Sequence, residues 1–161
     1  MKSNAMLMPA VWGGLLIGVL SALPLVGAAN ICCCMWVIAG GMMAAYLLQS
    51  NNPQAITTGD GALVGLLAGV IGAVVHTLVS IPIHLLLGGV TQRVLQQVVN
   101  NAPDVPENLR QLMENMSNSA AFSILGVLVG FVFWLFCGSI FAALGGLLGA
   151  VFFKKKDVPA V

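Results

Sequence analysis

The feature that most constrains this chain is the near absence of charge along two long stretches. Between Ser3 and Gln92 the only charged residue is Asp60, and from Asn115 to Phe153 there is none. A domain folded in water needs a charged, solvated surface, which these stretches cannot supply. A lipid bilayer is a solvent that apolar side chains can face. The sequence therefore predicts an integral membrane protein.

The composition agrees with this interpretation. A soluble domain carries about 25% charged residues, whereas this chain of 161 residues has 7% charged and 59% hydrophobic residues and a mean hydropathy of +1.00. The formal net charge is +1, without a basic patch that would release counterions from nucleic acid. Nucleic acid is therefore not an expected partner.

Four apolar segments are each long enough to cross a hydrocarbon core of about 30 Å as a helix. They lie at about residues 9–29, 31–48, 61–87 and 124–152. The sequence thus predicts an all-α polytopic membrane protein with four transmembrane helices in one membrane domain, residues 1–161. The first segment could also pass for a secretory signal peptide, but we interpret it as a retained helix.

The first two connections are short. Asn30 is almost the whole link between the first two segments, which predicts a tight hairpin. The second connection runs from Gln49 to Asp60 and contains a turn signal at Asn51-Asn52-Pro53. Asp60 suits the N-cap of the third helix, because its side chain can accept a hydrogen bond from a free backbone N–H.

The last apolar run, from Ser119 to Phe153, is longer than one crossing needs. It is either one long helix that protrudes on the outer side or a re-entrant pair, and we expect one helix. With four crossings, Lys2 and the lysines at 154–156 fall on the same side, and the positive-inside rule makes both termini cytoplasmic. Asn30 and residues 90–118 then face outward.

Residues 90–118 form the only sizeable polar segment, and they show two amphipathic helical patterns. Gly88-Gly89 and the turn at residues 100–103 allow a bend before each pattern. The segment contains two arginines and three acidic residues, so it is not basic. It therefore differs from the basic helices that bind anionic lipid. We expect an extramembrane amphipathic helical hairpin. Its expected partner-contact residues are Val94, Val98, Leu109, Leu112, Met113 and Met116.

Glycines recur at helical spacing in every apolar segment. Lipid tails provide no hydrophobic drive between helices, so close backbone approach at small residues takes its place. In the third segment, the glycines share a stripe about 100° wide with His76 and Ser80. The expected helix-packing residues are Gly14, Gly18, Gly40, Gly61, Gly65, Gly69, Gly72, Gly126, Gly130, Gly138 and Gly146.

An internal repeat is also visible. Residues 14–22 and 65–73 are identical at six of nine positions, and Gly40-Gly41 and Gly145-Gly146 open a weaker echo. Two parallel two-helix halves would follow, as in some transporters. The alternative is that segments rich in glycine, alanine, leucine and valine match by chance.

His76 is the ionisable side chain best placed at membrane depth, where such groups often serve function. It could ligate a haem or a chlorophyll, or simply hydrogen bond to a neighbouring helix. His84, a second candidate ligand, follows Pro82 near the outer interface. We expect Pro82 to kink the helix. Otherwise we expect no cofactor.

Cys32, Cys33 and Cys34 point in three directions around a helix and cannot close one tetrahedral metal site. We interpret them as small apolar filler and expect no bound metal. The crossings also contain neither an activated nucleophile with its base nor paired carboxylates. An enzyme is therefore not expected.

Three motifs carry a resemblance. They are Asn30-Ile31-Cys32-Cys33-Cys34 ahead of Gly40-Gly41, the Gly59-Asp60-Gly61-Ala62 opening of the third segment, and Gly145-Gly146-Leu147-Leu148-Gly149 ahead of the lysines. With them the chain resembles an uncharacterised family of small four-helix bacterial inner-membrane proteins. The resemblance implies a bacterial inner membrane and no particular activity.

The sequence thus favours a non-enzymatic membrane protein that acts by association, as a homo-oligomer or as an accessory subunit of a larger membrane complex. A small channel or transporter is the first alternative, motivated by the repeat. A haem- or chlorophyll-binding subunit that uses His76 is the second.

Overall fold

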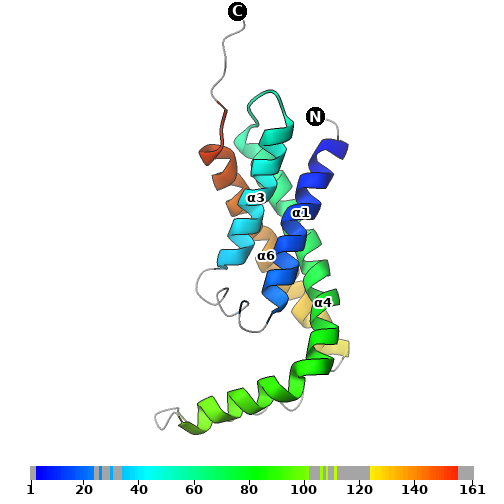
Figure 1. The fold of residues 1–161 in the computed structure, drawn as a ribbon, viewed down its shortest axis with the longest axis vertical. Helices are drawn as coiled ribbons and strands as arrows, with labels where there is room; N and C mark the ends of the chain where they lie inside the picture. The colour runs from blue at the N-terminus through cyan, green and yellow to red at the C-terminus, as the bar shows by residue number, and fades with distance from the viewer. Residues whose placement is uncertain are drawn as a thin grey trace, which may run out of the picture.

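The structure is a computed structural model that describes residues 3–23, 26, 30, 34–101, 106, 108, 111 and 124–155. In these residues it is all-helical (Figure 1). The helices are α1 (Ser3–Ala22), α3 (Met35–Asn51), α4 (Thr58–Asn101) and α6 (Ile124–Phe152). Three of them are long and apolar enough to cross a membrane, over Ala5–Ala22, Thr58–Ile83 and Gly126–Phe152. The chain therefore has the helices of a membrane protein.

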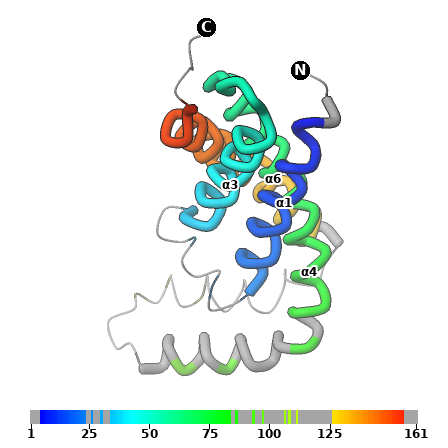
Figure 2. The backbone as a smooth tube through the Cα atoms, turned by 45° about the horizontal axis from the view of Figure 1, so that its top comes forward, coloured from blue at the N-terminus to red at the C-terminus, as the bar shows by residue number. Residues whose placement is uncertain are grey.

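The four helices form a bundle in which direction alternates along the chain. α1 and α4 run the same way, and α3 and α6 run the opposite way (Figure 1). The start of α1, the connection between α3 and α4 and the end of α6 consequently lie at one end of the bundle, which we name the lysine end after Lys154 and Lys155 (Figures 1 and 2). α3 and α4 each contact the other three helices.

The first helix begins and ends earlier than the predicted 9–29, since it spans Ser3–Ala22. Hydropathy alone does not mark a helix start, because the polar residues at its beginning are also helical. Its end follows from Pro24: the residue before a proline is disfavoured in the α conformation, and Leu23 is already outside the helix.

The second helix spans Met35–Asn51 instead of 31–48. Cys34 precedes it in the left-handed conformation (φ 50°, ψ 39°), which no α-helix can continue through. Asn30 organises the connection to α1: its side chain donates to Ser21 Oγ at 2.8 Å and accepts from the Trp36 N–H at 3.2 Å. At the other end, the Asn52 side chain donates to the Leu48 carbonyl at 2.7 Å.

The third helix starts at Thr58, and the expectation that Asp60 is its N-cap was wrong by three residues. Thr57 is the cap. Its Oγ accepts from the Asp60 N–H at 3.1 Å, while Asp60 Oδ2 accepts from the Thr57 N–H at 3.1 Å and from its hydroxyl at 2.7 Å. This reciprocal pattern is a capping box, in which Asp60 takes the position usually held by glutamate.

α4 then continues to Asn101 without a break at Gly88-Gly89. Its expected end at residue 87 was therefore wrong, and the first half of the expected hairpin is the last part of this helix. Figure 1 shows that α4 bends, so that its last part runs sideways. Pro82 lies inside the helix and cannot donate to the Leu78 carbonyl, which weakens the helix locally. Most of residues 102–118 lie outside the described part of the chain.

The last helix, Ile124–Phe152, agrees with the expected 124–152. It is continuous, so a re-entrant pair is wrong for these residues. No charge interrupts the segment, and Lys154 and Lys155 follow its end.

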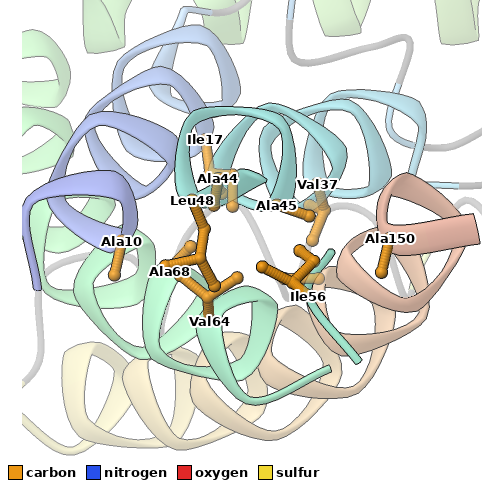
Figure 3. Close-up of a cluster of buried hydrophobic side chains, with 11 residues drawn as sticks. Ala10, Ile17, Val37, Ala44, Ala45, Leu48, Ile56, Val64, Ala68 and Ala150 are labelled. Atoms are coloured by element: carbon orange, nitrogen blue, oxygen red, sulfur yellow. The ribbon is translucent and has the colours of Figure 1, made fainter. Parts of the chain in front are cut away.

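The core of the bundle consists of small and aliphatic side chains. Figure 3 shows them converging between the helices. Alanines dominate because the backbones approach closely and leave little volume for side chains. The buried cluster contains Ala10, Ile17, Val37, Ala44, Ala45, Leu48, Ile56, Val64, Ala68, Ala142 and Ala150.

Candidate functional site

The glycine contacts between helices are the most distinctive feature of the bundle. α1, α3 and α6 each contain two adjacent glycines whose directions differ by about 100°. A Cβ added at Gly13 would meet the Gly40 carbonyl oxygen of α3 at 2.6 Å, whereas one at Gly14 would meet Ile71 of α4 at 2.7 Å. One glycine pair thus lets α1 approach two neighbours at once.

The same arrangement recurs in α3. A Cβ on Gly40 would collide with Ile17 of α1, and one on Gly41 would collide with the Ala142 carbonyl of α6. Glycine is required at both positions because the atoms in the way belong to the backbone or to a buried side chain.

In α6 the pair faces two further neighbours. A Cβ on Gly145 would meet the Ile38 carbonyl of α3, and one on Gly146 would meet the Gly61 carbonyl of α4. The sequence analysis included Gly14, Gly40 and Gly146 but missed their neighbours Gly13, Gly41 and Gly145. Adjacency was the signal that could have identified them.

The glycine stripe of α4 divides between two partners. Added Cβ atoms at Gly61, Gly65 and Gly69 would all meet the backbone of α6, the last at 2.7 Å from the Gly138 carbonyl oxygen. Gly72 faces α1, where a Cβ would lie 2.8 Å from Ile17. α4 therefore packs closely against both α6 and α1.

The remaining expected packing glycines behave differently. Gly18 lies against α4 at Val75, but a Cβ on Gly138 would make only ordinary contacts at 3.8 Å. Among the described residues, nothing lies within 4 Å of a Cβ added at Gly130, so the described part of the bundle gives this glycine no close helix contact. Gly126 is half-buried. The sequence analysis did not include Gly149. A Cβ added there would lie 2.9 Å from the Met42 carbonyl oxygen.

His76 lies between α4 and α6. Its ring stacks on Trp134 with centroids 4.3 Å apart, and its Nε2 is 3.4 Å from Ser80 Oγ. One ring face and the Nε2 edge are therefore occupied. An axial bond from Nε2 to a haem or chlorophyll would compete with Ser80 for this nitrogen. In this structure the imidazole joins α4 to α6.

Several other expected site residues cannot be placed. His84, Val94 and Val98 belong to α4, but the structure does not describe their side chains. Leu109, Leu112, Met113 and Met116 lie outside the described residues, as do Cys32 and Cys33. Among the described residues, no group of three or more His, Cys, Asp or Glu side chains could hold a metal ion.

At the lysine end, Gln49 fixes the connection between α3 and α4. Its side chain is 3% exposed, donates to the Gln54 carbonyl at 3.1 Å and accepts from the Ile56 N–H at 2.9 Å. Lys155 donates to the Asn52 carbonyl at 2.8 Å. The connection is therefore held by a buried amide and by the end of α6.

α6 is the least covered of the three candidate spans: 11% of its most apolar window is buried, against 44% for α1 and 33% for α4. Large apolar side chains repeat every three or four residues along one side of it. We name this stripe the α6 outer face. It consists of Val129, Phe133, Phe136, Ile140, Leu144, Leu147 and Val151, all exposed.

Comparison with known proteins identifies no relative of this chain. No family model, curated protein or solved structure matches the chain. The resemblance to a family of bacterial inner-membrane proteins stays a prediction.

Proposed function

We propose that this protein crosses the bilayer four times, with α3 as the fourth span. α3 has 17 residues, which corresponds to about 26 Å and nearly matches the hydrocarbon core. It is uncharged and contacts all three candidate spans. Because it lies among them, it occupies the same depth. Lys154 and Lys155 support a cytoplasmic lysine end, by the positive-inside rule, in a bacterial inner membrane.

Within that membrane we propose a non-enzymatic role by association, in which α6 binds a helix of another subunit or of a second copy. The observation that carries this proposal is the α6 outer face. From Val129 to Val151 it extends over about 33 Å, the full thickness of the hydrocarbon core. Phe133 and Phe136 are 64% and 63% exposed. The amphipathic segment 90–118 would add a contact outside the bilayer.

Site-specific photo-crosslinking tests this proposal. A photoreactive phenylalanine analogue replaces Phe136 on the α6 outer face, or Leu66 on the exposed side of α4 as the matched control. After irradiation of native membranes and mild detergent extraction, we expect a discrete protein adduct from position 136 and none from position 66. Lipid adducts alone at both positions would contradict an association role for α6.

The transporter alternative retains one specific observation. α1 runs parallel to α4 and α3 runs parallel to α6, as two parallel repeats would require (Figure 1). The matching glycines Gly14 and Gly65 both lie at helix contacts. Ion or solute flux in reconstituted vesicles would support this second candidate, and vesicles no leakier than empty ones would remove it.

A further inference from the structure

A cavity of about 560 Å³ opens at the lysine end of the bundle. It lies between the start of α4 and the last turn of α6. Its volume is in the range of small-molecule sites. Its lining consists of Ala55, Ile56, Thr57, Thr58, Ala150, Val151 and Lys154.

The lining divides into an apolar floor and a polar rim. Ile56 and Ala150 are 5% and 2% exposed and belong to the buried cluster (Figure 3). Thr57, Thr58 and Lys154 are exposed at the rim and carry two hydroxyls and an ammonium group. An occupant would therefore need an apolar part and an anionic, hydrogen-bonding part.

Among the described residues, Asp60 is the acidic group near this rim, and its carboxylate binds Thr57. Asp60 Oδ2 accepts two hydrogen bonds from Thr57 in the capping box. On the basic side, Lys154 lines the cavity, whereas Lys155 is directed to the Asn52 carbonyl. Within the described part of the chain, Lys154 is consequently the positive charge that lines the cavity.

The depth of the cavity identifies the kind of occupant. The apolar span of α4 begins at Thr58 and that of α6 ends at Phe152. The cavity lining, at residues 55–58, 150, 151 and 154, therefore lies at the edge of the hydrocarbon core, where phospholipid phosphates and glycerol groups are found. Basic pockets between membrane helices at this level suit anionic headgroups.

We propose that this cavity binds the headgroup of an anionic phospholipid. Lys154 pairs with the phosphate, the hydroxyl of Thr58 donates to a phosphate or glycerol oxygen, and the first acyl methylenes lie against Val151. The inference depends on α4 and α6 crossing the membrane. It shares Val151 with the α6 outer face, but its test through Lys154 does not involve that face.

Native mass spectrometry of the full chain, with equimolar phosphatidylglycerol and phosphatidylcholine, tests the proposal. We expect the wild type to retain phosphatidylglycerol preferentially. Lys154→Gln should reduce this preference about fivefold, because this is the effect on binding of one lysine near an anionic lipid. Lys155→Gln removes the same charge outside the cavity and should change the preference less than about twofold.

A second variant tests the cavity itself. Val151→Trp fills it from an exposed position without changing charge, and it should also displace the anionic lipid. Equal losses in Lys154→Gln and Lys155→Gln would show diffuse attraction to the lysines and overturn the proposal. So would retention of both lipids alike, unchanged binding in Val151→Trp, or displacement of the lipid by inorganic phosphate.

Discussion

The glycine contact between α4 and α6 allows a sharp test with an internal control. Gly65→Ala adds one methyl group where its Cβ would collide with the Ala142 carbonyl and lie 3.0 Å from Gly146 Cα. Both are backbone atoms of α6, so no side-chain rotation relieves the clash. Gly130→Ala adds the same methyl group to α6 at a position where no described residue lies within 4 Å.

The expected magnitudes have opposite signs. Overpacking a tight contact costs about 1–3 kcal/mol. At about 2–4 °C per kcal/mol for a chain of this size, Gly65→Ala should lower the apparent Tm by roughly 2–12 °C. Gly130→Ala should leave it unchanged or raise it by a few degrees, because alanine favours a helix over glycine by about 0.5–1 kcal/mol.

Tryptophan fluorescence during heating in lipid nanodiscs measures both effects. Trp134 reports on this interface, since it stacks on His76 across it. A Gly65→Ala protein as stable as the wild type, or a Gly130→Ala protein that is equally destabilised, would refute the reasoning that backbone contact, and not glycine content, determines stability.

Three further predictions concern the connections. Thr57→Ala removes the α4 cap and should cost about 0.5–2 kcal/mol, seen as faster amide hydrogen exchange in the first turn of α4, whereas unchanged exchange would contradict the capping box. Gln49→Leu leaves the Ile56 N–H without its partner and should lower stability by about 1–3 kcal/mol in the same thermal assay; a neutral effect would show that water replaces the amide. In a variant with the native cysteines replaced by alanine, a cysteine at Asn101 should react with a membrane-impermeant reagent in intact cells, and reaction only after the inner face is opened would reverse the proposed topology.

Several features followed from the sequence because they depend on one segment at a time. The absence of charge from 115 to 153 indicated a bilayer, and the apolar segment at 124–152 within it gave the bounds of α6, since an apolar segment of that length is expected to be a helix there. Local backbone signals in the sequence also mark helix ends, but the sequence analysis did not use Pro24 or Thr57. Pro24 ends α1, and Thr57 with Asp60 starts α4.

Only the tertiary structure decided which small residues meet and which polar groups gather. Periodicity gives the direction in which a glycine faces around its own helix. A contact also requires a neighbouring helix that passes close to the glycine at the same level of the bundle. Gly130 therefore looked like Gly65 in the sequence, but no described residue lies within 4 Å of a Cβ added to it, while Gly41 lies against α6. The stacking of His76 on Trp134 and the cavity that brings Thr57 to Lys154 likewise join residues far apart in the chain. No local sequence pattern predicts these contacts, because they form only when α4 and α6 pack together.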